Sequence, residues 1–164
     1  MENKMLKFRL AESSEKSAIF ELYNSVKGTE FCAWDESYPG IAEIENDFNS
    51  KSLYVLIQGD MLVGALSVVP QNELDDFDCW DINDGRQKEI ARIVIAPNHR
   101  GKGYARIMIN EITDILSNSL CSAIHLSASA ENLPALSNYK KLGFSIKSKV
   151  HIYDGEYYLL ERII

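Results

Sequence analysis

One stretch decides how this chain folds and what it binds: Asn98-His99-Arg100-Gly101-Lys102-Gly103-Tyr104-Ala105. It lies between a run of apolar residues and an amphipathic helical pattern. Gly101 and Gly103 have no Cβ, so the backbone around Lys102 can come close to a ligand. The helix that follows offers free N–H groups and the positive end of its dipole at its first turn. The stretch therefore predicts a seat for a phosphate or pyrophosphate group.

Two other phosphate-binding motifs do not fit this stretch. A P-loop requires Gly-Lys followed by Ser or Thr, and here Gly103 is followed by Tyr104. A Rossmann fingerprint requires a third small residue where this chain has Arg106, and an acidic residue at the end of the next strand. For the glycines taken alone, a tight strand-to-helix turn without a ligand remains the alternative.

Composition sets the broad class. The 164 residues predict a single domain, 1–164, of which 46% of residues are hydrophobic and 25% charged, as is ordinary for a globular protein. The net charge of −7 argues against nucleic acid as a partner and mildly favours a cationic substrate. No apolar run reaches the ~20 residues of a membrane helix, and the first residues do not resemble a signal peptide. We therefore expect no membrane partner.

Cysteine and histidine usage is unremarkable. Cys32, Cys79 and Cys121 are odd in number and widely spaced, which favours a reducing, cytoplasmic compartment. None of them has a sequence neighbour that suggests a nucleophile. The three histidines show no metal-ligand spacing, and we expect no metal.

Hydrophobic periodicity predicts an alternation of strands and helices. Strands are expected at residues 6–10, 53–57, 61–69, 90–96, 123–128, 144–152 and 156–163. Helices are expected around residues 19–26, 41–48, 104–116 and 134–142. Between them, residues 70–87 form an acidic loop. The order of elements predicts a mixed α/β domain.

A second motif follows the strand at 123–128: Asn132-Leu133-Pro134-Ala135-Leu136-Ser137-Asn138-Tyr139-Lys140-Lys141-Leu142-Gly143-Phe144. With this motif the chain resembles the GNAT superfamily of acyl-CoA-dependent N-acyltransferases. The pyrophosphate motif of that family, Gln/Arg-x-x-Gly-x-Gly/Ala, is matched by Arg100, Gly103 and Ala105. The second family motif is matched by Asn132, Ala135, Tyr139, Gly143 and Phe144. The resemblance is strongest over residues 89–145.

The resemblance implies a fold and a cofactor. The GNAT fold has a mostly antiparallel mixed sheet of about seven strands, splayed between strands four and five and flanked by about four helices. Acetyl-CoA would be the cosubstrate, with its pantetheine arm paired to the main chain of Ile93 and Ile95, with Val94 between them. Asn132 would bond the pantetheine arm, although a plain helix N-cap is the alternative for this residue. The pyrophosphate would be held by the backbone N–H groups of Gly101, Lys102, Gly103, Tyr104 and Ala105, with Arg100 or Lys102 adding charge.

Two residues are candidates for the chemistry. The resemblance makes Tyr139 the acid that protonates the sulfur of coenzyme A; a core aromatic is the alternative. Some family members carry a general-base Glu at the position where this chain has Ser127. This departure puts an N-terminal protein acetylation mechanism of that type in doubt. Glu89, at the start of the fourth strand and in phase with Ala91 and Ile93, is the candidate base; a solvated strand end is the alternative.

The acceptor site is expected near the segment between the first two helices. Glu30, Trp34, Glu36 and Tyr38 fall in this segment, which often walls the acceptor site in the family. Trp80 stands among six acidic residues of the loop, where a cationic amine could be attracted and packed by cation–π contact. The alternative is a solvated loop whose tryptophan packs into the core.

The leading interpretation is an acetyl-CoA-dependent N-acetyltransferase that acts on the primary amine of a small molecule, such as a polyamine or an amino-acid derivative, by direct attack. One alternative is a non-catalytic acyl-CoA-binding sensor or regulatory module. Another is an interaction domain that keeps the fold without the cofactor. A homodimer through the terminal strands is compatible with the family but not required.

Overall fold

The structure, a computed structural model, describes residues 5–69 and 73–164. The start of the chain, and the first three residues of the predicted acidic loop 70–87, lie outside the described residues. The strands are β1 (Leu6–Leu10), β2 (Leu53–Gln58), β3 (Met61–Val69), β4 (Lys88–Ile95), β5 (Ala123–Ser129), β6 (Ser145–Ile152) and β7 (Gly155–Ile163). The helices are α1 (Lys16–Val26), α2 (Ile41–Asn49), α3 (Tyr104–Asn118) and α4 (Leu133–Lys141). The strands and helices that periodicity predicts are present, most with ends shifted by one or two residues.

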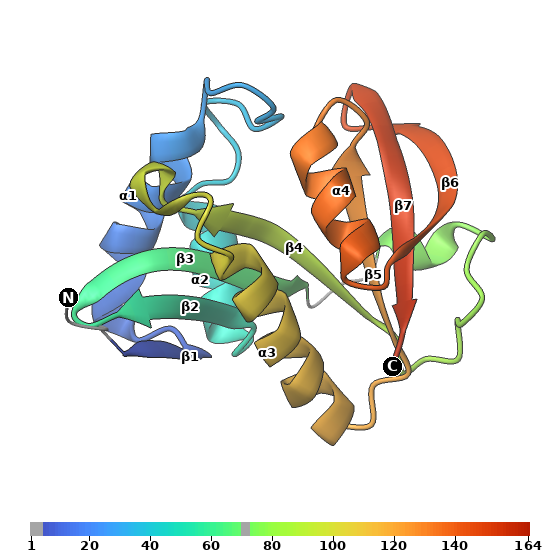
Figure 1. Cartoon of the computed structure of the whole chain (residues 1–164), viewed down its shortest axis with the longest axis horizontal. Coiled ribbons are helices and arrows are strands. Elements are labelled where there is room, and N and C mark those ends of the chain that lie inside the picture. Colours follow the sequence, from blue (N-terminus) through green and yellow to red (C-terminus); the bar gives the residue numbers. More distant parts are fainter. Residues whose placement is uncertain (1–4, 70–72) are drawn as a thin grey trace.

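The described strands form one sheet in the order β1-β2-β3-β4-β5-β7-β6. Within it β4 and β5 pair in parallel, and the other neighbours pair antiparallel. The parallel pairing covers only Lys88↔Ile124 and Glu89↔His125, after which the two strands diverge (Figure 1). This confirms the expected mixed sheet with a gap between its fourth and fifth strands.

Two hydrophobic clusters hold the helices against opposite faces of the sheet. Helices α3 and α4 pack on one face, where Met108, Ile112 and Leu136 are buried. Helices α1 and α2 pack on the other face of the N-terminal half, where Ile19 and Ile44 are buried. On that second face of β5 and β7, residues 73–87 take the place of a helix (Figure 1). Among the described residues, no helix is both long enough and apolar enough to cross a bilayer.

A bulge in β4 changes which of its side chains share a face of the sheet. Ala65 pairs with Val94 and Ser67 pairs with Ala91, so β4 holds one more residue than β3 between these pairs. The extra residue adopts the left-handed conformation at Arg92, with φ 51°. Ile93 then packs against the α3 side, as Ile90 does, although the two are three residues apart. The expectation that Glu89 alternates in phase with Ile93 is therefore wrong.

The Arg92 side chain explains why the bulge is stable. Its Nε and Nη2 donate to the two carboxylate oxygens of Asp47 in α2, at 2.9 and 2.8 Å. Asp47 is fully buried and also accepts from the hydroxyl of Ser67 at 2.7 Å. A bidentate guanidinium–carboxylate pair is among the stronger polar contacts, so it can hold β4 in this bent path.

Candidate active site

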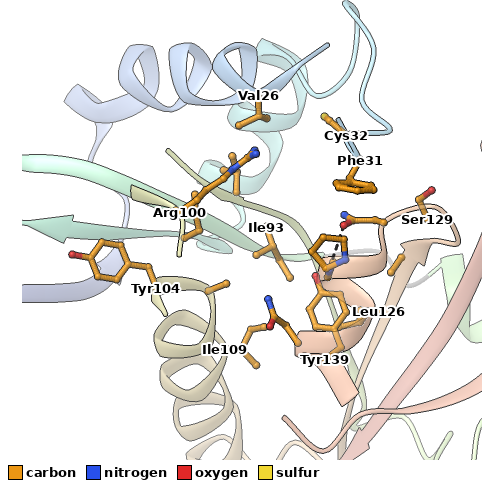
Figure 2. Close-up of a pocket in the computed structure, with 18 of the residues that line it drawn as sticks. Val26, Phe31, Cys32, Ile93, Arg100, Tyr104, Ile109, Leu126, Ser129 and Tyr139 are labelled. Atoms are coloured by element: carbon orange, nitrogen blue, oxygen red, sulfur yellow. Dashed lines mark hydrogen bonds between the residues drawn. The ribbon is translucent and has the colours of Figure 1, made fainter. Parts of the chain in front are cut away.

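The gap between β4 and β5 opens into a cavity of about 1060 Å³. Its walls are β4, the turn at residues 99–106, β5, the start of α4 and the segment 30–34 (Figure 2). The sequence-predicted residues that line it are Glu30, Trp34, Ile93, Val94, Ile95, Arg100, Gly101, Lys102, Gly103, Tyr104, Ala105, Asn132 and Tyr139. Glu89, Tyr38 and Trp80 do not line it. One cavity thus brings together both sequence motifs.

The glycine turn presents unpaired backbone donors to this cavity. Gly101 and Gly103 have φ values of +77° and +78°, a conformation that side chains with a Cβ rarely adopt. Gly103 is the N-cap of α3, and the first N–H of the helix to meet a carbonyl is that of Ile107, which donates to Gly103 at 3.1 Å. No backbone acceptor is found in the described part of the chain for the N–H groups of residues 101–105. The turn can therefore hold an anion.

Side chains around the turn separate into buried and exposed groups. Tyr104 is buried, and its hydroxyl accepts a hydrogen bond from Gln58 at 2.8 Å, so only its backbone is free for a ligand. Arg100 is exposed and points toward Val26 at the end of α1 (Figure 2). Lys102 is exposed at the turn itself. Both cations are available to an anionic ligand.

The edge of β4 that faces the gap is open beyond Glu89. No β5 residue pairs with the described β4 residues 90–95, so their main-chain groups on this side have no strand partner. Asn132 lies across the gap and caps α4, because its Oδ1 accepts from the N–H of Ala135 at 3.2 Å. The helix-cap alternative for Asn132 is thus confirmed, and Asn132 also lies in the cavity wall.

Tyr139 points from α4 into the cavity, across from Ile93 (Figure 2). Its ring packs edge-on against Phe144 with centroids 5.8 Å apart. Its hydroxyl makes no hydrogen bond to any residue that the structure describes. Burial raises the pKa of Tyr139 to about 12, so the phenol keeps its proton at neutral pH. The residue has both the packing of a core aromatic and a free hydroxyl in the cavity.

Glu89 is buried where β4 and β5 diverge. Its exposed fraction is 7%, which excludes the solvated strand end as its environment. Burial raises the pKa of Glu89 to about 7. The charge of Arg92 opposes this shift, whereas the carboxylates of Glu73 and Asp75 add to it. A carboxyl group with such a pKa can take up and release a proton at neutral pH.

One side of the cavity is formed by the segment between α1 and α2, where the sequence predicts the acceptor site. Glu30 and Trp34 line the cavity, and Trp34 packs edge-on against Tyr23 at 5.5 Å between centroids. Tyr38 lies just outside it, where its hydroxyl accepts a hydrogen bond from Arg92 at 3.0 Å. Glu36 is exposed and does not line the cavity.

Some residues that line the cavity were not predicted from the sequence. Phe31 and Cys32 lie in the expected segment without a chemical signature of their own. Tyr157 reaches the cavity from β7, and nothing in its local sequence distinguishes it from the other alternating residues of that hairpin. Ser127, where some family members carry a Glu, also lines the cavity.

Trp80 does not belong to this cavity. Its ring stacks on His125 with centroids 3.7 Å apart and planes 9° apart, and its Nε1 donates to the Leu74 carbonyl at 2.8 Å. His125 is on the face of β5 opposite α3, so this contact places the Trp80 side chain between the acidic loop and β5. Trp80 therefore packs against His125 and not in the cavity where an acceptor was expected, in agreement with the packing alternative for this residue.

Comparisons with known proteins agree with this geometry. The sequence model of the acetyltransferase (GNAT) family matches residues 17–144. The chain is 27% identical to a spermidine N(1)-acetyltransferase of Vibrio cholerae over 143 residues, which is 87% of this chain and 80% of that protein. It is 39% identical over 62 residues to YobR of Bacillus subtilis, described as an uncharacterized N-acetyltransferase. That match spans 38% of this chain and only 25% of the YobR protein.

Solved structures share the fold over nearly the whole chain. A GNAT-family acetyltransferase from Streptococcus agalactiae superposes with a TM-score of 0.83 at 21% identity, covering 97% of this chain and 95% of that one. The putative acetyltransferase yncA of Salmonella typhimurium, solved with its cofactor acetyl-CoA, gives 0.72 at 17% identity, covering 97% and 94%. The family model covers most of this chain, and the chain belongs to the acetyltransferase (GNAT) family. The expected class, an acetyl-CoA-dependent N-acetyltransferase, is thereby confirmed.

Proposed function

We propose that this enzyme transfers the acetyl group of acetyl-CoA to the primary amine of a small cationic molecule, such as a polyamine, by direct attack of the amine. One observation carries the proposal. A single cavity joins an anion-binding turn, an unpaired strand edge and a free tyrosine hydroxyl. A homodimer through the terminal strands stays a prediction, as does a cytoplasmic location, which the three free cysteines favour.

The cofactor fits the cavity by backbone chemistry. The N–H groups of residues 101–105 hold the pyrophosphate, and Arg100 and Lys102 add charge. The open edge of β4 at Ile93 and Ile95 pairs with the amides of the pantetheine arm, as an added strand would. Asn132 bonds the same arm from the other wall. When bound, acetyl-CoA supplies an acyl thioester that an amine can attack.

Proton transfer is assigned to Glu89 and Tyr139. An alkyl ammonium has a pKa near ~10 and must lose a proton before it can attack. The Glu89 side chain does not line the cavity itself. Glu89 is therefore assigned to accept this proton through an ordered water. Tyr139 keeps its proton at neutral pH and donates it to the departing sulfur, and the tyrosinate then takes the second proton, which the amine nitrogen loses as it becomes an amide. No acyl-enzyme is needed, since neither Tyr139 nor Glu89 acts as a nucleophile.

A cationic acceptor is supported by the charges near the cavity. Glu30 lies in its wall, and the carboxylates of Glu73 and Asp75 act on the neighbouring Glu89. Trp34 and Phe31 offer aromatic faces on the same side, which favour an ammonium group. The relative from Vibrio cholerae acts on spermidine, a molecule of this class.

A panel of acceptors tests the proposal. We would measure the release of coenzyme A thiol from acetyl-CoA with polyamines, amino acids, aminoglycosides and short peptides at one pH. Polyamines should give the highest kcat/KM, and added salt should raise their KM because the attraction is electrostatic. Neutral or anionic amines acting better than polyamines would refute the charge argument. A lack of turnover with every amine, while acetyl-CoA still binds, would favour the binding-module alternative.

A further inference from the structure

Three titratable side chains form a row across the sheet. Glu89 of β4 is the register partner of His125 of β5, and His125 is the register partner of Glu161 of β7. Residues opposite one another on paired strands point to the same face. All three are buried, with exposed fractions of 7%, 1% and 2%. The row thus runs from the candidate base to a buried pair that the proposed reaction does not use.

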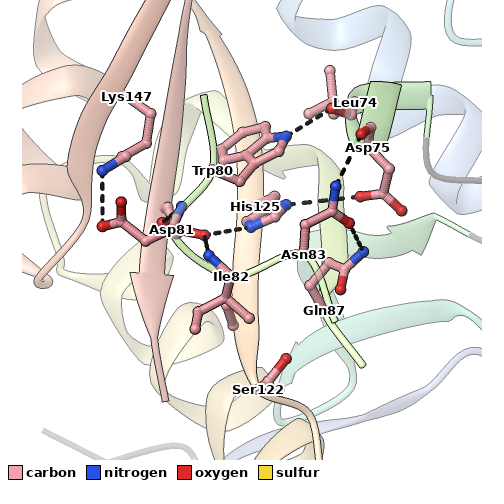
Figure 3. Close-up of polar contacts among 12 residues, drawn as sticks. Leu74, Asp75, Trp80, Asp81, Ile82, Asn83, Gln87, Ser122, His125 and Lys147 are labelled. Atoms are coloured by element: carbon pink, nitrogen blue, oxygen red, sulfur yellow. Dashed lines mark hydrogen bonds and ion pairs between the residues drawn. The ribbon is translucent and has the colours of Figure 1, made fainter. Parts of the chain in front are cut away.

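The buried pair anchors the acidic loop. His125 Nε2 lies 2.7 Å from the Glu161 carboxylate, which also accepts from the backbone N–H groups of Asp81 and Ile82 at 3.0 Å each (Figure 3). On the loop side, Trp80 stacks flat on the His125 ring. One buried carboxylate and one ring therefore fix the middle of the loop to β5 and β7.

The rest of the loop is tied to this anchor. The Nε1 of Trp80 donates a hydrogen bond to the Leu74 carbonyl, and the side chain of Asn83 donates one to the Asp75 carbonyl at 3.2 Å (Figure 3). These contacts fix the Glu73–Asp76 turn. The Asp75 carboxylate lies 3.8 Å from His125 Nδ1, an atom that is buried and has no hydrogen-bond partner among the described residues. The position of the Glu73–Asp76 turn thus depends on the packing of Trp80 on His125.

We propose that His125 is a positioning residue for acetyl transfer: paired with Glu161 and stacked under Trp80, it seats the 73–87 loop so that Glu73 and Asp75 stand beside Glu89. The inference rests on the proposed role of Glu89 as the base.

The groups that face Glu89 come from four elements. Arg92 lies on its own strand, His125 on β5, Glu73 and Asp75 on the loop, and Tyr153 at the turn between β6 and β7. Of these, only the two carboxylates belong to the loop. Displacing the loop removes these two negative charges from the neighbourhood of Glu89, and this change favours the charged form of its carboxyl group.

The test replaces His125 by phenylalanine, which keeps a flat ring under Trp80 but cannot bond Glu161. The matched control is His151→Phe, because His151 also lies 2.8 Å from a glutamate, Glu156, but in an exposed pair. The titration of Glu89 is followed by carboxyl ¹³C NMR in the protein without substrates, with its signal assigned by loss in Glu89→Gln. His125→Phe should lower the Glu89 midpoint by about one pH unit, and His151→Phe should leave it unchanged.

A second readout connects the shift to the reaction. The acidic limb of the kcat/KM profile should move down with the NMR midpoint in His125→Phe, while the affinity for acetyl-CoA is kept. An unmoved Glu89 midpoint in a folded His125→Phe protein overturns the inference. If that variant does not fold, Asp75→Asn serves instead, and an unmoved midpoint there has the same meaning. An unchanged pH–rate profile in Glu89→Gln would instead refute the role of Glu89 as base, so the two failures are distinguishable.

Discussion

Replacing Glu89 by glutamine should stabilise the folded protein while it removes the candidate base. In the folded chain the pKa of Glu89 is about 7, against an ordinary value of 4.5. Between these values the unfolded chain releases the proton and the folded chain keeps it, so stability falls as pH rises. Above pH 7 both states are ionised, and the penalty is constant at about 3 kcal/mol. Glutamine has no such penalty.

Urea denaturation at pH 5 and pH 8 measures this effect. The difference in unfolding free energy between Glu89→Gln and the wild type should grow by about 2–3 kcal/mol from pH 5 to pH 8. For a chain of 164 residues, a gain of this size corresponds to a melting temperature higher by roughly 4–12 °C. Any constant gain or loss from the amide itself cancels in this comparison, because only the pH-dependent part reports on the buried carboxyl.

The control is Glu111→Gln, which changes an exposed glutamate on α3. Its stability difference from the wild type should be the same at both pH values. A Glu89→Gln difference that also stays constant from pH 5 to pH 8 would show that Glu89 is not held in a neutral, buried state. The argument for Glu89 as a base tuned to neutral pH would then fail.

Three further predictions concern the cavity and its support. Gly101→Ala and Gly28→Ala both place a Cβ on a residue with left-handed backbone, so each should lower the free energy of unfolding, measured in urea, by about 1 kcal/mol. Only Gly101→Ala should also weaken acetyl-CoA binding, measured by calorimetry. Equal affinities would refute the anion-binding role of the turn. Asp47→Ala leaves the Arg92 guanidinium buried without its partner and should lower the unfolding free energy by about 3–5 kcal/mol; a loss under 1 kcal/mol would mean that the pair does not support the bulge. Tyr139→Phe should lower kcat at least ~10-fold with little change in acetyl-CoA affinity, and equal turnover would refute its role as acid.

The fold was predictable because its signals are local. Alternation marks the first strand, short apolar runs mark the central strands, and a period near 3.6 marks the helices, so element order followed from the chain alone. The gap between β4 and β5 was expected only from the resemblance carried by the Arg100 and Asn132 motifs. The glycine turn, by contrast, could be interpreted physically, because Gly101 and Gly103 have the backbone freedom that the turn uses.

What escaped prediction depends on contacts between distant segments. The left-handed backbone of Arg92 in β4 is supported by Asp47 of helix α2, whose carboxylate binds the Arg92 guanidinium. That bulge changes which side chains share a face with Glu89. The packing of Trp80, and the position of Glu73 and Asp75 close enough to Glu89 to act on its carboxyl group, both depend on how residues 73–87 pack on the sheet. The acidic composition of the loop does not reveal this packing.

The most direct test of the account is the pH dependence of a single turnover of acetyl transfer to a polyamine, measured for the wild type and Glu89→Gln with acetyl-CoA prebound. The account predicts a wild-type rate that rises to a plateau with a midpoint near pH 7. In Glu89→Gln the rate should be at least ~10-fold lower at pH 8 and should climb steadily toward the pKa of the free amine. Superimposable profiles for the two proteins would contradict the account.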